Sequence, residues 1–257
     1  MKIRNAKPSD KNHILAFCQN TFSWGDYIAN VWDQWIKEGR LTVIENNDIP
    51  IGMCHSIING DQLWIEGLRI DPDFRRRGIA TKLVTYAEKM ANRKKCSLSR
   101  MLIAKNNTRS LKMAYSLGYD IEGRWWLYNM EPKKQLTKVR LASKNQALSL
   151  NGKIFSESWK WYSLDRKTLM RLLLHKQIVV CGNAIGIWNI SSIDKDVLQI
   201  GYLDGPKSDG RQILKFVQNK GHNLKSRRIQ ILMSDSMSIY GAGIEKRMLF
   251  CLMRKNL

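Results

Sequence analysis

Several kinds of feature are scarce in this sequence, and each scarcity excludes a class of protein. No apolar run approaches the roughly 18 residues of a membrane-spanning helix, and the first residues lack the long apolar segment of a secretory signal. The five cysteines are widely scattered without a C-x-x-C pair, and only four histidines are present. We therefore expect a cytoplasmic protein with reduced thiols, no disulfide framework, no metal site and no membrane partner.

Acidic residues are also few. The 257 residues hold 22 Asp and Glu against 43 Lys and Arg, for a net charge of +21. Residues 1–135 carry 22 basic and 14 acidic residues (+8), and residues 136–257 carry 21 and 8 (+13). Such a surplus attracts polyanions, whether nucleic acid or the phosphates of a ligand. No recognised nucleic-acid-binding motif accompanies the charge, so nucleic acid is not the partner we favour, although charge alone leaves it open.

One stretch carries most of the functional information. Residues 63–70 (LWIEGLRI) have the composition of a buried strand, and Asp71-Pro72-Asp73 ends it because proline cannot continue a strand ladder. Residues 75–80 (RRRGIA) then lead into residues 81–90, whose apolar positions have the spacing of a core-facing helix. A basic, glycine-containing turn at a helix start predicts a phosphate site, because the first backbone N–H groups of a helix are unpaired and its dipole is positive there.

The pattern Arg75-x-x-Gly78-x-Ala80 after a strand resembles the acyl-CoA pyrophosphate loop of the GNAT superfamily of N-acetyltransferases. This resemblance implies an α/β (α+β) fold with a central, mostly antiparallel sheet flanked by helices, and acetyl-CoA as co-substrate. The later segment, with Asn107 opening a helix that closes at Gly118, is similar to the pantetheine-binding segment of that family. By resemblance, acetyl-CoA would be bound by Leu68, Arg69, Ile70, Arg75, Arg76, Arg77, Gly78, Ile79, Ala80, Thr81, Asn107, Ser110 and Leu111.

Acetyl transfer to an amine requires that the acceptor ammonium lose a proton, and Glu66 is the candidate base. A carboxylate inside an apolar strand is costly unless it has a function or a partner. The alternative is that Glu66 forms a salt bridge with Arg69 or Arg124. His55 on the neighbouring strand is a weaker candidate for the base, since a hydrogen-bonded core histidine explains it equally well.

The thiolate that leaves acetyl-CoA needs a proton, which the family takes from a tyrosine four residues before the glycine at 118. This sequence has Ala114 there and Tyr115 one residue later, which turns the side chain by about 100° around the helix. Tyr115 is therefore predicted as the general acid, with packing as the alternative. The resemblance also implies a bulge near Gly67-Leu68 that exposes strand backbone to pantetheine.

The acceptor is predicted to be a primary amine of a small molecule or an amino acid, with a protein N-terminus or lysine as alternatives. Trp24, Asp26 and Tyr27 flank the expected acceptor groove, where a carboxylate and aromatic faces suit a cation. Asp26 is equally explained as the cap of the following helix. The competing function is a CoA-binding or basic nucleic-acid-binding protein with little catalysis.

The domain prediction divides the chain at a polar, basic stretch. Residues 1–131 form the acetyltransferase domain, 132–150 a linker, and 151–257 a degenerate copy of the first domain or a small unrelated α/β domain. The second part repeats the order of three strands, a helix and two strands, but has Gly205-Pro206-Lys207-Ser208-Asp209-Gly210 in place of the arginine turn. We expect one acetyl-CoA site in the chain, and homodimerisation stays open.

Overall fold

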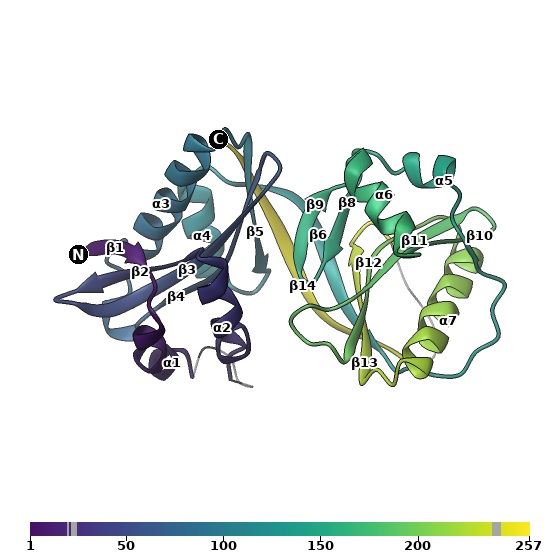
Figure 1. Ribbon diagram of the computed structural model, residues 1–257, viewed down its shortest axis with the longest axis horizontal. Coiled ribbons are helices and arrows are strands. Elements are labelled where there is room, and N and C mark those ends of the chain that lie inside the picture. Colours follow the sequence, from purple (N-terminus) through teal and green to yellow (C-terminus); the bar gives the residue numbers. More distant parts are fainter. Residues whose placement is uncertain (20, 22–24, 238–242) are drawn as a thin grey trace. The chain divides into compact units, whose positions relative to one another are not determined.

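The computed structural model describes residues 1–19, 21, 25–237 and 243–257. The chain forms two compact units. The first comprises Met1–Glu122 together with Met253–Leu257, and the second comprises Gly123–Leu252. Both combine a sheet with helices, as Figure 1 shows for each unit by itself.

The sheet of the first unit follows the strand order β1-β2-β3-β4-β5, with the end of β14 beside β5. From β1 to β4 the neighbouring strands pair antiparallel, whereas β4 and β5 run parallel. Five strands come from the first half of the chain and the last from its end: β1 (Lys2–Asn5), β2 (Leu41–Asn46), β3 (Ile49–Asn59), β4 (Gln62–Ile70), β5 (Leu98–Ala104) and β14 (Ile244–Asn256).

Helices of the first unit form where the sequence shows apolar residues at helical spacing. They are α1 (Lys11–Cys18), α2 (Ile28–Glu38), α3 (Ile79–Arg93) and α4 (Thr108–Ser116), with short 3-10 turns at Pro8–Asp10 and Pro72–Phe74. The inward face of α2 buries Ile28, Val31, Trp32 and Trp35, as their spacing predicts. Gly39 ends that helix in a left-handed conformation, the usual glycine stop.

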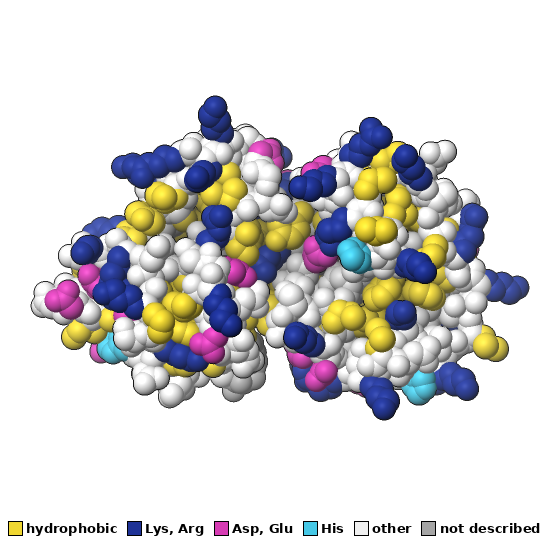
Figure 2. Space-filling view, in the orientation of Figure 1, with side chains coloured by type: hydrophobic (Ala, Val, Ile, Leu, Met, Phe, Trp, Pro, Cys, Tyr) yellow, Lys and Arg dark blue, Asp and Glu magenta, His cyan; other side chains and the backbone are white. Residues whose placement is uncertain are grey.

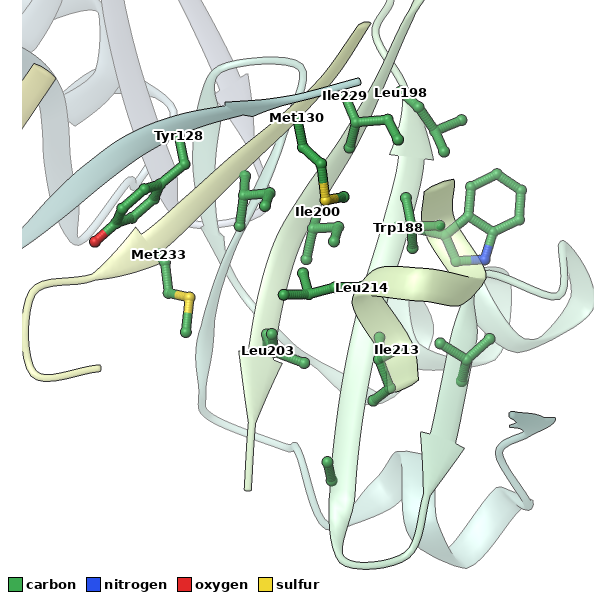
Figure 3. Packing of buried hydrophobic residues seen from close by; sticks show 14 residues of the cluster. Tyr128, Met130, Trp188, Leu198, Ile200, Leu203, Ile213, Leu214, Ile229 and Met233 are labelled. Atoms are coloured by element: carbon green, nitrogen blue, oxygen red, sulfur yellow. The ribbon is translucent and has the colours of Figure 1, made fainter. Parts of the chain in front are cut away.

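The second unit has the strand order β6-β13-β12-β11-β10-β7, again with one parallel pair, β12 and β13. Its elements are β6 (Asp120–Met130), β7 (Arg140–Leu141), α5 (Lys144–Leu148), β8 (Ile154–Glu157), β9 (Lys160–Ser163), α6 (Arg166–Leu174), β10 (Ile178–Cys181), β11 (Ala184–Ile190), β12 (Val197–Asp204), α7 (Lys207–Asn223) and β13 (Arg228–Ser234). Side chains of α7, such as Ile213 and Leu214, pack onto the sheet residues Ile200, Leu203 and Ile229 (Figure 3).

The two units repeat one order of strands, in keeping with the predicted repetition of the first half in the second. In each, antiparallel strands lead to one parallel pair, with a long helix between its two strands: β4-α3-β5 in the first unit and β12-α7-β13 in the second. The next strand in each unit comes from the other half of the sequence. The end of β14 lies beside β5, and β6 lies beside β13.

The predicted boundaries differ from these units. The stretch 132–150, expected to be a linker, contains β7 and α5, and Ala142, Ala147 and Leu150 belong to a buried cluster of the second unit. β6 starts in the first unit and continues in the second, so the chain changes units near residue 122 rather than 131. The composition of 132–150 is polar because most of its residues are exposed.

The second unit has a β-bulge at the position that corresponds to the bulge of the first unit, but the space beside it is occupied. The pairing of β11 with β12 shifts register between Ile187 and Trp188, opposite Gly201. A side chain at Gly201 would meet the backbone oxygen of Ser156 at 1.7 Å, because the hairpin of β8 and β9 packs directly against this strand. The space beside the bulge is thus occupied by the protein's own backbone.

Candidate active site

The central feature of the first unit is an opened strand, β4. Its pairing with β3 shifts register between Met53 and His55, so that Gly67 and Leu68 form the predicted bulge, and Gly67 has φ +63°. Its parallel pairing with β5 runs from Gln62↔Leu98 to Ile65↔Met101. In the part of the chain that the structure describes, no register pair joins β4 to β5 beyond Ile65, although β4 continues to Ile70. The register thus leaves this edge of β4 open toward β5, although the carbonyls of Leu68 and Ile70 accept hydrogen bonds of 3.1 and 3.2 Å from the Arg69 and Arg75 side chains.

The ring of Trp35 covers the bulge. A Cβ built on Gly67 would lie 2.6 Å from this ring, so glycine is required there both by the contact and by the positive φ. The same tryptophan stacks on the imidazole of His55, with ring centroids 4.1 Å apart and planes 8° from parallel. Helix α2 thereby fixes the shape of the strand next to Glu66.

The loop after β4 has the geometry of an anion site. Arg76 has φ +62° and Gly78 has φ +72°, so the backbone turns twice through the left-handed region before α3 begins at Ile79. Gly78 is the N-cap of α3 and provides no side-chain hydrogen bond to the first turn. The N–H groups of that turn can thus bind an anion. Asp71 accepts a hydrogen bond from the Asp73 N–H and stabilises the preceding turn.

An open cavity of about 590 Å³ lies against this loop and is lined by Pro72, Asp73, Arg75, Arg76, Arg77 and Arg109. Four guanidinium groups and one carboxylate border it, so its potential is strongly positive. The three loop arginines are exposed. Figure 2 shows Lys and Arg on the visible face of both units, but the convergence of four arginines on one cavity and one helix start distinguishes this place from a generally basic surface.

Glu66 lies beside the bulge and is held by neighbouring side chains. His55 Nδ1 lies 2.9 Å from its Oε1, and the Trp64 indole donates a hydrogen bond of 3.2 Å to its Oε2. The other ring nitrogen of His55, Nε2, lies 3.0 Å from Oε2 of Glu38. The side chain of Glu66 is 11% exposed, whereas His55 is fully buried. His55 is therefore a hydrogen-bonded core histidine.

The salt bridge of Arg69 is with Asp26, whereas the sequence alternative paired Glu66 with Arg69 or Arg124. The guanidinium donates hydrogen bonds of 2.7 and 3.1 Å to the Asp26 carboxylate, whose side chain is only 4% exposed. Burial alone would lower the pKa of Arg69, but the bonds to Asp26 outweigh it and hold that pKa above its ordinary value.

This pair bears on two predicted roles. The Arg69 side chain points to Asp26 and not to the phosphate loop, and Asp26 is neutralised rather than offered to a cationic acceptor. Asp26 also accepts a hydrogen bond of 3.2 Å from the Ile28 N–H at the start of α2, but the N-cap of this helix is Tyr27 and not Asp26, which corrects the alternative role as helix cap. The ring of Tyr27 faces the Arg69 guanidinium at 5.4 Å. Trp24 lies outside the described residues.

Helix α4 places the residues of the second predicted binding segment. Asn107 is its N-cap, and its side-chain oxygen accepts a hydrogen bond of 3.1 Å from the Ser110 N–H. Ser110 and Leu111 are half-buried on the first turn. Ala114 is fully buried, whereas Tyr115 is 47% exposed, as expected from the turn of about 100° between successive helical residues. A role for Tyr115 as general acid stays a prediction.

Other chemistry receives little support in the first unit. Burial raises the pKa of the Cys54 thiol to about 12, and the charge of Glu66 adds to the effect, so this thiol beside the bulge is protonated and is a poor nucleophile. Among the residues that the structure describes, no group of three His, Cys, Asp or Glu side chains could hold a metal ion. No helix within the described ranges is both long and apolar enough to cross a membrane.

The family model of the acetyltransferase (GNAT) family matches residues 11–119, which lie within the first unit. The first unit is a GNAT domain. The chain is also similar to two fish proteins named histidine N-acetyltransferase. It is 29% identical to that of Scomber australasicus over 85 residues, which are 32% of this chain and 25% of the relative. The match to the Oreochromis niloticus protein is 29% over 104 residues, 37% of this chain and 31% of the relative. The chain thus matches less than a third of each relative's length.

Solved structures extend the GNAT likeness to the whole chain. A Sphaerobacter thermophilus GCN5-related N-acetyltransferase is 16% identical, covers 99% of this chain and 95% of its own, and has a TM-score of 0.68. An acetyltransferase structure from Thermoplasma acidophilum covers 100% of both chains at 14% identity, with a TM-score of 0.70. At such identities the likeness shows the fold alone. That fold, a mixed α/β architecture with a mostly antiparallel sheet flanked by helices, is the predicted one.

Three residues of the site were missed from the sequence. Arg109 lines the basic cavity, and Trp35 and Glu38 both contact His55 from α2. A signal existed for Glu38, because it lies three residues after Trp35 and so on the same side of the helix. For Arg109, its position two residues after Asn107, at the start of the helix expected to approach CoA, was the available signal.

Proposed function

We propose that this protein is an acetyl-CoA-dependent N-acetyltransferase whose acceptor is the primary amine of a small molecule or amino acid. The observation that carries the proposal is the combination of an opened β4 edge with an uncapped helix start and a four-arginine cavity immediately after it. A co-substrate with several phosphates at one end and an extended amide-bearing arm at the other suits these two surfaces.

The residues present fit acetyl-CoA. The N–H groups of the first turn of α3 and the side chains of Arg75, Arg76, Arg77 and Arg109 would bind its phosphates. Backbone N–H groups of Leu68 and Ile70 would bind the pantetheine arm, because these residues lie past the last register pair with β5, while their carbonyls already accept hydrogen bonds from Arg69 and Arg75. Ser110 and Leu111, on the first turn of α4, would line that arm. Bound in this way, acetyl-CoA supplies the activated acyl group.

Glu66 is the proposed base. It lies directly before the bulge, is 11% exposed, and its two oxygens are oriented by His55 and Trp64. The acceptor ammonium gives up a proton to Glu66, directly or through water, and its lone pair then attacks the thioester carbonyl. The C–S bond breaks with its electron pair on sulfur, and the nitrogen loses its second proton to water. Tyr115 is the proposed donor of the proton that sulfur receives, and its phenolate is reprotonated from water.

The acceptor assignment rests on similarity and on charge. The two relatives bear the name histidine N-acetyltransferase, which favours an amino acid or a comparable small amine. Glu66 and Glu38 place negative charge near the bulge, which favours a cationic acceptor. Asp26 takes no direct part in acceptor binding, because Arg69 neutralises it.

A screen of free thiol released from acetyl-CoA tests this function. The acceptors would include histidine, other amino acids, polyamines, an aminoglycoside and a peptide with a free N-terminus. We expect release with small amines and a loss of about 10²- to 10⁴-fold in kcat for Glu66→Gln, with acetyl-CoA affinity unchanged. Binding of acetyl-CoA with no release from any acceptor would contradict the enzyme and support a CoA-binding protein instead.

A further inference from the structure

A line of three titratable side chains runs from the bulge of β4 to the surface of the first unit. Glu66 on β4 contacts Nδ1 of His55 on β3 at 2.9 Å, and Nε2 of His55 contacts Glu38 at the end of α2 at 3.0 Å. The side chain of Glu66 is 11% exposed, that of His55 is fully buried, and that of Glu38 is 32% exposed. The inner end adjoins the proposed reaction site and the outer end reaches solvent.

The central ring has one orientation. It is stacked on Trp35 with planes 8° apart, and each ring nitrogen faces a carboxylate oxygen. Glu38 is itself oriented, because the Gln34 amide donates a hydrogen bond of 2.8 Å to its other oxygen, Oε1. A base held by a second side chain that a third side chain orients is the arrangement that activates reactive groups in many enzymes.

The second unit shows that the fold does not require these groups. There the cross-strand pair next to the bulge is Trp188↔Ile200, where the first unit has His55↔Glu66. The second unit builds the same strand order and a similar register shift with apolar side chains. Two carboxylates and an imidazole at this place are therefore an addition to the scaffold, found in the unit that carries the arginine cavity.

We propose that His55 and Glu38 are positioning residues that orient Glu66 for proton abstraction, an inference that rests on the proposed function. The contact of His55 Nδ1 and the hydrogen bond from the Trp64 indole N–H fix the plane of the Glu66 carboxylate, and Glu38 fixes the orientation of the imidazole ring through its contact with Nε2. The proton still passes from the acceptor nitrogen to Glu66. Neither Glu38 nor His55 touches the acceptor.

A double-mutant cycle tests the positioning role. Glu38→Gln should lower kcat about tenfold and leave the affinity for acetyl-CoA unchanged. In the Glu66→Gln background the same substitution should have no further effect, because the group that it orients is gone. Asp33→Asn, which removes a largely exposed carboxylate from the same helix, is the matched control and should leave kcat unchanged.

A tenfold loss from Glu38→Gln in both backgrounds would overturn the proposal, since the residue would then act independently of Glu66. His55→Asn gives a second variant, because the asparagine amide can replace the contact that Nδ1 makes with Glu66 but not the contact that Nε2 makes with Glu38. It should retain more activity than His55→Leu at equal thermal stability. Equal activities of the two variants would also overturn the proposal.

Nitrogen-15 spectra of histidine-labelled protein provide a readout that needs no acceptor. Glu66→Gln should mainly shift Nδ1 of His55 and Glu38→Gln mainly Nε2, with the His55→Asn variant identifying the signals. If the nitrogen-15 signals of His55 do not shift in these variants, the contacts of His55 with Glu66 and Glu38 are absent in solution and the proposal is wrong, even in an active enzyme. If the shifts appear but no amine is acetylated, the proposed function is wrong and the positioning role is wrong with it. If the enzyme is active but the effects of Glu38→Gln and Glu66→Gln on kcat are additive, only the positioning role is wrong.

Discussion

Gly67 is the residue on which the open edge of β4 depends. Its φ is +63°, and a Cβ would lie 2.6 Å from the Trp35 ring. We expect Gly67→Ala to lower the free energy of unfolding by about 1–3 kcal/mol, because strain and overpacking act together. Thermal and chemical denaturation measure this change. Gly60→Ala is the control, because Gly60 has a similar φ of +60° with nothing within 4 Å. Equal losses in the two variants would show that the Trp35 contact has no effect.

Arg109 is predicted to bind phosphate although it lies outside the loop. Arg109→Glu should weaken acetyl-CoA binding about tenfold and reduce the salt dependence of that binding, because one of four cavity cations becomes an anion. Titration calorimetry at two salt concentrations measures both. Arg93→Glu makes the same change of charge at the far end of α3 and should have little effect. Similar losses for both variants would indicate attraction by overall charge rather than a site.

At this scale the sequence pointed to Glu66, the proposed base, but not to the side chains that contact it. Glu66 was identified because a carboxylate in an apolar strand needs a reason. Its partner was expected among arginines near in sequence or at the end of the domain, and His55 was considered only as a rival base. The bulge explains the error, because an extra residue at 67–68 breaks the simple alternation that decides which side chains share a face.

The exchanged strand β14 is an element on which the first unit depends. Its Lys255 donates a hydrogen bond of 2.8 Å to Glu88, whose side chain is 8% exposed, and the Leu257 N–H bonds to the Ser97 carbonyl. Lys255→Met should lower the free energy of unfolding by roughly 1–3 kcal/mol, because a buried carboxylate loses its cation. Chemical denaturation measures the free energy of unfolding of Lys255→Met and of a double variant that carries both Lys255→Met and Glu88→Gln. The double variant should be the more stable of the two; the reverse order would contradict the account.

Helices and strands were predictable where the spacing of apolar residues and the turn residues beside them determine the secondary structure. The strands and helices on each side of the phosphate loop, and the three strands, helix and two strands of the second half, are found at or near their expected positions. The hairpin of β8 and β9, helix α6 and the exchange of β6 and β14 were not foreseen. Strand exchange pairs residues far apart in the sequence, from 99 to 109 positions for β6 and β13, which no local spacing encodes. The polar stretch 132–150 misled because a short edge strand and a five-residue helix leave little periodicity.

For the whole molecule, the two units explain why one chain should bind one acetyl-CoA. The first unit has the opened strand and the arginine cavity. The second has Gly205-Pro206-Lys207 at the corresponding turn, with Pro206 as the N-cap of α7 and Asp209 in its first turn. The Asp209 carboxylate accepts a hydrogen bond from the Asn183 N–H, which places negative charge where phosphate would bind. The packing of Ser156 against Gly201 also fills the space beside the bulge.

Titration calorimetry of acetyl-CoA into the purified protein tests this account most directly. We predict one site per chain with micromolar affinity, and no binding by Gly78→Asp. Aspartate tolerates the left-handed conformation of Gly78 better than most residues, so the variant should fold while placing a negative charge at the start of α3. Two sites per chain would show that the second unit also binds the co-substrate. No binding by the wild type, or unchanged affinity in Gly78→Asp, would contradict the assignment of the loop and the function built on it.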